Sequence, residues 1–158
     1  MKLPERVRQI IEATGLSAVV VSLLLVAYQI RQANQIAQAT TTYEIVRDIN
    51  QFNDMGITDP VFADLLVQLG KEDFAPSETQ TRQAQLLAYR FLNAWVTQEI
   101  AFRNGLFTEG QFSLTKNDVV TVMDDYPALL PYWRAAMRNQ PEFANYDAMQ
   151  PLVERSVE

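Results

Sequence analysis

Near the N-terminus, 18 consecutive residues carry no charge, from Ala13 to Ile30 between Glu12 and Arg31. As an α-helix, a segment of this length rises about 27 Å, close to the thickness of the hydrocarbon core of a bilayer. Two isoleucines before Glu12 extend the apolar stretch further. We therefore predict one transmembrane helix over residues 10–31.

Two other interpretations of the apolar run remain open. A secretory signal peptide also has basic residues before an apolar core, and Ala37-Gln38-Ala39 resembles a small-residue cleavage site. However, the run is longer than the roughly 7 to 15 residues of a typical signal core, and this site lies beyond Arg31. A buried core helix is the second alternative, although such helices tend to be shorter and to keep a polar stripe.

Basic residues near the ends of the run predict its orientation. Lys2, Arg6 and Arg8 precede it, whereas Arg31 and Arg47 follow it. Because translocation of cations is disfavoured, the excess before the run predicts a cytoplasmic N-terminus. We expect a single-pass protein with its C-terminal domain on the outer side.

A face of small side chains is a candidate site for helix packing in the membrane. Gly15, Ala18 and Ser22 are separated by three and four residues, so they share one face of a helix. Small side chains allow a second helix to approach closely.

A polar, nearly uncharged segment follows the apolar run. Residues 29–38, QIRQANQIAQ, contain four glutamines and one asparagine. Gln29, Gln32 and Gln35 are candidates for hydrogen bonds between neighbouring helices, since amides both donate and accept. The alternative interpretation is a solvated stalk next to the membrane.

The net charge of the chain lies in its second part. Residues 1–54 hold five acidic and five basic side chains, so the net charge of -6 resides in residues 55–158. An acidic surface disfavours nucleic acid, which requires clustered Lys and Arg, and it also disfavours anionic lipid. We therefore divide the chain into residues 1–54, with a tail, the transmembrane helix and a juxtamembrane helix, and residues 55–158, an acidic helical domain.

Helical spacing and capping signals predict an all-α fold. Neither Gly nor Pro occurs between Leu16 and Met55, so the transmembrane helix is expected to continue to Asp54-Met55-Gly56. N-cap residues, prolines and glycines predict further helices at 61–69, 78–104, 109–125, 132–139 and 147–157. The predicted architecture is a single transmembrane helix that continues into a long helix, followed by a small helical bundle.

The sequence shows no catalytic, cofactor-binding or metal site. Histidine and cysteine are absent, and with them the commonest base near neutral pH, the commonest metal ligand and the thiol nucleophile. Asp124 and Asp125 are adjacent, but neighbours on a helix point about 100° apart and do not share a proton. Glu99 and Arg103 have the spacing of an ordinary surface ion pair. We expect no enzyme activity, no cofactor and no metal.

Aromatic residues supply the remaining candidates for recognition. Their helical spacing is typical of a packed core, but Trp95, Phe102 and Trp133 alternatively line a pocket for an apolar ligand. Trp, Tyr and Arg dominate the energetics of protein interfaces. On that basis the predicted partner surface near the C-terminus consists of Tyr132, Trp133, Arg134 and Arg138.

Two stretches resemble a known family. Residues 27–39 read AYQIRQANQIAQA, and residues 132–143 read YWRAAMRNQPEF. They resemble a family of small uncharacterised bacterial proteins with one N-terminal transmembrane helix that ends in a QIRQ-type motif. The chain departs from that family at Ala33-Asn34, where Asn-Thr is common, and in its extra basic residues before the span. The resemblance implies an all-helical protein of the bacterial cytoplasmic (inner) membrane, whose outer side is the periplasm, and it supplies no activity.

These features predict a protein that acts by contact. We expect a structural or accessory subunit of a larger membrane complex, with other membrane proteins or a second copy of itself as partners. The alternative is a membrane-tethered ligand-binding or sensor domain with an aromatic-lined pocket. A third class, an enzyme that uses carboxylates alone, is opposed by the missing histidine and cysteine.

Overall fold

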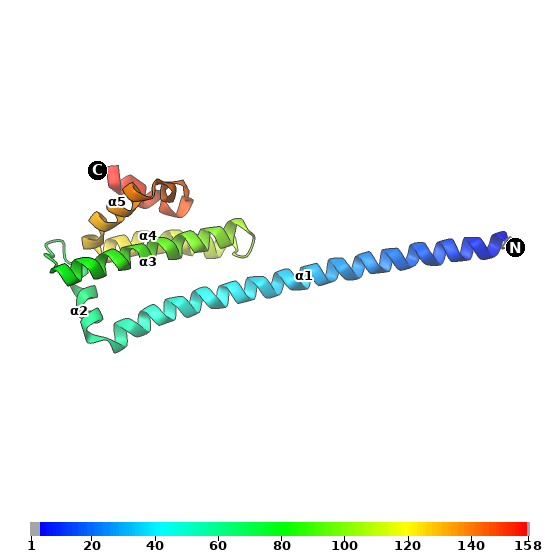
Figure 1. Cartoon of the computed structure of the whole chain (residues 1–158), viewed down its shortest axis with the longest axis horizontal. Coiled ribbons are helices and arrows are strands. Elements are labelled where there is room, and N and C mark those ends of the chain that lie inside the picture. The colour runs from blue at the N-terminus through cyan, green and yellow to red at the C-terminus, as the bar shows by residue number, and fades with distance from the viewer. Residues whose placement is uncertain (1–3, 158) are drawn as a thin grey trace. The chain divides into compact units, whose positions relative to one another are not determined.

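The described part of the chain is all-α. The computed structural model describes residues 4–157, which form six α-helices and three short 3-10 helices and no strand. In chain order the elements are α1 (Glu5–Thr58), α2 (Pro60–Leu69), α3 (Glu78–Arg103), α4 (Glu109–Asp125), η1 (Pro127–Leu129), α5 (Leu130–Asn139), η2 (Pro141–Asn145), η3 (Asp147–Met149) and α6 (Gln150–Val157). The predicted fold class is confirmed, and every predicted helix is present (Figure 1).

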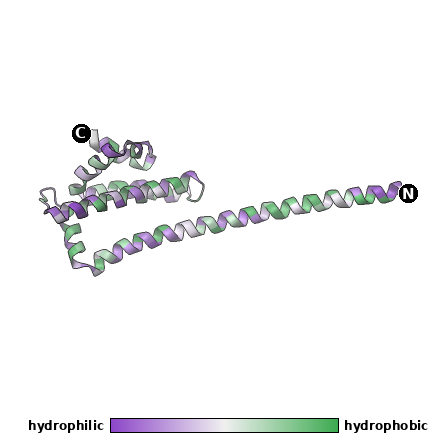
Figure 2. Ribbon diagram, in the orientation of Figure 1, coloured by the Kyte–Doolittle hydropathy of each residue, from purple (hydrophilic) through white to green (hydrophobic). Residues whose placement is uncertain are grey.

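The chain divides into two compact units between Thr40 and Thr41. The first unit contains the N-terminal part of α1, and the second contains the remaining turns of α1 with all the helices that follow. Among the helices described, α1 is the one long and apolar enough to cross a membrane, with a mean hydropathy of 2.2 over an 18-residue window. Figure 2 shows this apolar stretch of α1 with polar residues on either side.

The long helix ends later than predicted, at Thr58, so Gly56 does not stop it. It ends because Asp59 precedes Pro60, and a residue before proline is disfavoured in the helical conformation. Asp59 is extended, and its carboxylate accepts hydrogen bonds from two backbone N–H groups in the first turn of α2. Asp59 thus ends α1 and caps α2. The sequence predicted its role as the cap of α2 but not its role at the end of α1.

Side-chain caps begin the two central helices. Ser77 and Gln80 form the predicted capping box before α3, and Thr108 and Gln111 form the one before α4. Between the helices Gly105 has a φ of 70°, a left-handed conformation that residues with a Cβ disfavour. The chain reverses there, so that α3 and α4 lie side by side (Figure 1).

The core of the second unit surrounds α3, which contacts α4, α5, η1 and η3. This arrangement agrees with the apolar residues that α3 carries on more than one face. The largest fully buried apolar side chains lie in the segment from α2 to α6 and are Trp95, Trp133, Leu65, Leu69, Leu92, Leu129, Met149, Leu152 and Val119.

Aromatic contacts join the end of α1 to this core. The Phe52 ring lies 5.6 Å from Phe62 and 5.4 Å from Phe91 between centroids, both in edge-to-face geometry. The Arg90 guanidinium lies over Phe52, 5.4 Å from its centroid. Residues 41–58 of α1 therefore belong to the second unit. The sequence predicted a division after residue 54, whereas the two compact units meet between residues 40 and 41.

Candidate functional site

The apolar part of α1 is exposed throughout the first unit. None of its 18-residue apolar window is buried inside the chain. The core helix of a soluble protein buries most of its apolar residues, whereas 0% of this window is buried. Its side chains are thus available to lipid or to another helix.

The small residues predicted for helix packing lie on this exposed stretch. Gly15, Ala18 and Ser22 are all exposed, and no residue outside the local helix lies within 4 Å of a Cβ added to Gly15. The Ser22 hydroxyl donates to the Ala18 carbonyl oxygen at 2.8 Å, which satisfies it inside the helix. The face therefore presents small side chains, and its role in helix packing stays a prediction.

The amides after the apolar run are exposed as well. The side chains of Gln29, Gln32 and Gln35 form no hydrogen bond with any residue among 4–157. A hollow of about 330 Å³ lies among Gln32, Gln35, Tyr28 and Arg31. All four residues come from α1, and a single helix does not enclose a small ligand. The arrangement favours contact with another helix, for which amides supply both donors and acceptors.

The prediction of Trp133 on an exposed partner surface is wrong. Its side chain is 0% exposed, and its indole N–H donates to the Ala88 carbonyl oxygen of α3 at 3.2 Å. Its ring lies 6.0 Å from Trp95 and 6.4 Å from Phe91 between centroids. Burial of this large ring, with a partner for its N–H, stabilises the packing of α5 on α3.

The other residues of the predicted surface have separate roles. Arg134 donates to the carbonyl oxygen of Arg155 near the C-terminal end of α6, where helix carbonyls lack an intrahelical partner. The Nε of Arg134 is buried and has no hydrogen-bond partner in the described part of the chain. Tyr132 is half-buried, and Arg138 is exposed. The predicted surface is therefore reduced to Arg138 and the edge of Tyr132.

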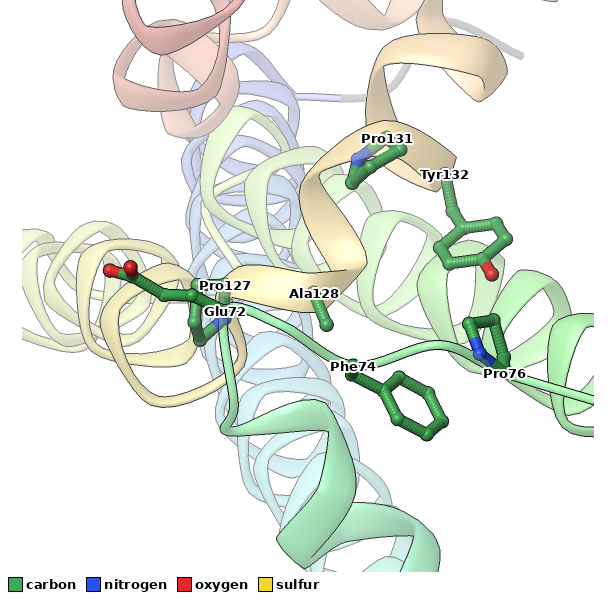
Figure 3. A pocket seen from close by; sticks show the side chains of 7 residues that line it. All are labelled: Glu72, Phe74, Pro76, Pro127, Ala128, Pro131 and Tyr132. Atoms are coloured by element: carbon green, nitrogen blue, oxygen red, sulfur yellow. The ribbon is translucent and has the colours of Figure 1, made fainter.

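Tyr132 lies at an open hollow between the α2–α3 loop and the start of α5 (Figure 3). The hollow has a volume of about 240 Å³ and is lined by Glu72, Phe74, Pro76, Pro127, Ala128, Pro131 and Tyr132. The Tyr132 ring points toward Pro76, whereas the Glu72 carboxylate points away from both (Figure 3). The polar groups do not converge, so the hollow lacks the feature that orients a small ligand.

The aromatic residues considered for a ligand pocket do not line a common cavity. Trp95 is 1% exposed, packs against Trp133 and donates its N–H to Asp118 Oδ2 at 2.7 Å. Phe102 instead stacks on Phe112, with centroids 4.4 Å apart. These rings fill the core, as their helical spacing indicates.

A buried carboxylate, Glu99, was missed by sequence reasoning. Its side chain is 1% exposed, and its carboxylate accepts hydrogen bonds from the backbone N–H groups of Asp147 at 3.0 Å and Ala148 at 2.8 Å. Arg103 donates to it at 2.5 Å from a half-exposed position. The predicted ion pair is therefore present, but its placement at the surface is wrong for Glu99, which is buried and also caps the N-terminal end of η3. The spacing of four residues indicates the pair but contains no signal for burial.

The remaining carboxylates form no reactive cluster. Asp124 binds Arg155 at 2.6 Å in an exposed ion pair. Among residues 4–157, no group of three or more His, Cys, Asp or Glu side chains is placed to hold a metal ion.

Comparisons with known proteins give no relative: no family model, no curated protein and no solved structure matches the chain. The resemblance to small bacterial membrane proteins stays a prediction. The candidate site is accordingly defined by the molecule's own features, which are the exposed apolar stretch of α1 and the amides that follow it.

Proposed function

We propose that the chain is a single-pass protein of the bacterial cytoplasmic (inner) membrane that acts by contact, as a structural or accessory subunit of a larger membrane complex. The observation that carries this proposal is the apolar window of α1, of which 0% is buried. Exposure of apolar surface to water costs about 25 cal/mol per Å², and a bilayer removes that cost. Lipid around residues 10–31 is therefore the first proposed partner.

The basic residues support an orientation with the domain in the periplasm. Arg6 and Arg8 lie on α1 before the apolar run, and Lys2 lies outside the described residues. Arg31 and Arg47 follow the run, so the excess of cations is on the N-terminal side. Fusion of a periplasm-dependent reporter to the C-terminus tests this orientation, and an inactive reporter at that position contradicts it.

The domain supports a role in contact and not in catalysis. Its tryptophans and Phe102 pack into a core, its open hollow has no convergent polar groups, and the chain has no histidine or cysteine. The net charge of -6 disfavours nucleic acid as a partner. Other membrane subunits or a second copy are the proposed protein partners.

Membrane attachment is tested by fractionation of cells that produce the full chain. Without detergent, the chain is expected in the membrane pellet, and recovery in the supernatant contradicts the proposal. An N-terminal tag that remains on the pelleted chain excludes cleavage at Ala37-Gln38-Ala39.

Two matched variants test whether the apolar run of α1 is surrounded by lipid or by water. Leu24 on α1 and Leu114 on α4 are 65% and 68% exposed, so the two leucines are matched in exposure and differ in whether they lie in the apolar run. An arginine in the middle of a transmembrane helix costs about 2.5 to 3.5 kcal/mol on insertion scales. We expect Leu24→Arg to lower the membrane fraction and Leu114→Arg to leave it unchanged; equal effects contradict a span.

The accessory role is tested after extraction in mild detergent. Size-exclusion chromatography with light scattering is expected to give a protein mass larger than that of one chain. A stable monomer from native membranes contradicts a role as a subunit.

A further inference from the structure

We infer that the partner of α1 is α1 of a second copy of this chain, paired in parallel and in register along one heptad seam. This inference rests on the membrane attachment proposed above and names a partner for it. The seam is defined by positions that alternate in steps of three and four residues. In the first unit these positions are Gly15, Ala18, Ser22, Leu25, Gln29, Gln32, Ile36 and Ala39.

The seam forms one exposed strip of the helix. At about 100° per residue, its positions in the first unit fall within an arc of about 120° on a straight helix. All of them are exposed. A repeat of 3.5 residues stays on one line when two helices wind around each other with a left-handed supercoil. The strip thus joins the small-residue face in the apolar run to the amides after it.

The charges favour an identical partner. In a parallel pair in register, each residue lies opposite its own copy, so a charged seam repels itself. Between Glu12 and Glu44 the chain has a single charged residue, Arg31, which lies off the seam. No seam residue in this stretch is charged, and a second copy meets no like charge along it.

The amides favour an identical partner for a second reason. Gln29 and Gln32 are on the seam, are exposed and have no hydrogen-bond partner among residues 4–157. An amide carries both donors and an acceptor, so each of two facing copies can donate to the other and accept from it. Polar residues at such positions fix the register and the number of helices.

The domain leaves the same register open in the second unit. Continued from Ala39, the steps of four and three residues fall on Tyr43, Val46, Asn50, Asn53 and Ile57. Tyr43, Val46 and Ile57 are 68%, 48% and 81% exposed.

In the second unit, α1 contacts the other helices through a face that differs from the seam. Thr42 accepts a hydrogen bond from Gln111 at 3.3 Å, and Phe52 packs on Phe62 and Phe91. These residues lie off the seam, so the domain covers another face of α1 and leaves the apolar seam residues for a partner helix.

The natural chain contains no cysteine, which allows a direct test by single cysteine substitutions in full-length protein in membranes. Ile36→Cys lies on the seam, and Asn34→Cys lies two residues away on the far side of the helix. A disulfide needs Cβ atoms about 3.5 to 4.5 Å apart, so oxidation is expected to give at least about tenfold more dimer from Ile36→Cys. Equal yields from the two variants, or no dimer from Ile36→Cys, overturn the inference.

A charge substitution gives a second, independent readout. Ile36→Lys places like charges opposite each other and is expected to shift the detergent-extracted protein to half the mass, whereas Asn34→Lys leaves the mass unchanged. Unchanged tryptophan fluorescence shows that the domain remains folded in both. Equal masses for the two lysine variants overturn the inference that the helices pair along this seam.

The same samples separate the failure of this inference from that of the proposed function. A chain that stays in the membrane pellet and has a mass larger than that of one chain, but gives no dimer from Ile36→Cys, overturns the pairing and leaves the proposed subunit role intact. A chain in the supernatant overturns both.

Discussion

Glu99 of α3 accepts a hydrogen bond from the backbone N–H of Ala148 at 2.8 Å, across 49 residues of sequence. Its other oxygen accepts a hydrogen bond from the N–H of Asp147, and the side chain is buried. One carboxylate therefore attaches the C-terminal helical segment to the central helix. Because η3 begins there, the negative charge also lies where a helix end is electropositive.

We predict that Glu99→Gln lowers the free energy of unfolding by about 2 to 4 kcal/mol, since the amide offers one acceptor where the carboxylate offers two. The two tryptophans both lie in the domain core, so their fluorescence during urea titration in detergent micelles measures domain unfolding. Glu142→Gln, at an exposed position, is the matched control and is expected to change stability by less than about 0.5 kcal/mol. Equal stability of the two variants contradicts the buried cap.

Trp133 and Arg138 lie on the same short helix, but their substitutions are expected to lower stability by different amounts. Trp133→Phe removes the N–H that donates to Ala88 and leaves a space in the core, at an expected cost of about 1 to 3 kcal/mol. Arg138→Ala changes an exposed residue and is expected to cost less than about 0.5 kcal/mol. The urea midpoint by Trp95 fluorescence checks both; a neutral Trp133→Phe contradicts the burial.

Local signals in the sequence predicted where α2, α3 and α4 begin and end, to within one residue. A capping box depends on two residues three positions apart, as in Ser77 with Gln80, and its outcome does not depend on the rest of the fold. The Asp-Pro pair before α2 and Gly105 after α3 act in the same local way. The apolar stretch of α1 was also predicted, because length and lack of charge are properties of the segment itself.

Contacts between distant segments were not predicted. On α5, Tyr132 and Trp133 are adjacent, and only the position of α3 decides that Trp133 enters the core. The burial of Glu99 likewise depends on N–H groups 48 and 49 residues away. The spacing rules describe one helix at a time, so they contain no information about which face another element covers.

Two glycines are expected to respond to alanine with opposite signs. A Cβ at Gly70 lies 3.2 Å from the backbone oxygen of Asp125, the last residue of α4. Because this is a backbone atom that cannot move aside easily, we predict that Gly70→Ala lowers the free energy of unfolding by about 1 kcal/mol. Gly110 in the first turn of α4 has nothing within 4 Å of an added Cβ. Gly110→Ala is predicted to stabilise the domain by about 0.5 to 1 kcal/mol. Urea titration checks the signs, and a stabilising Gly70→Ala contradicts the close approach of α2 to α4.

Tyr126 makes the stability of the domain sensitive to alkaline pH. Burial raises the pKa of Tyr126 above its ordinary value of 10.0, and the neighbouring Asp125 carboxylate raises this pKa further. Well below pH 10.0 the phenol is protonated in both the folded and the unfolded chain, so its stabilising effect is complete. Above that pH the unfolded chain loses the proton first, and the free energy of unfolding falls until the pH passes the raised pKa of the folded state.

The variant Tyr126→Phe isolates this contribution, because the ring that stacks on Phe91 remains while the titrating hydroxyl is removed. We expect the natural chain to lose stability more steeply than Tyr126→Phe between pH 9.5 and 11, by less than about 1.4 kcal/mol per pH unit. Urea titrations at a series of pH values measure the two slopes, and the other tyrosines, lysines and arginines contribute equally to both. Parallel slopes contradict the raised pKa of Tyr126, since the smaller number of protons bound by the unfolded chain is the sole source of the difference.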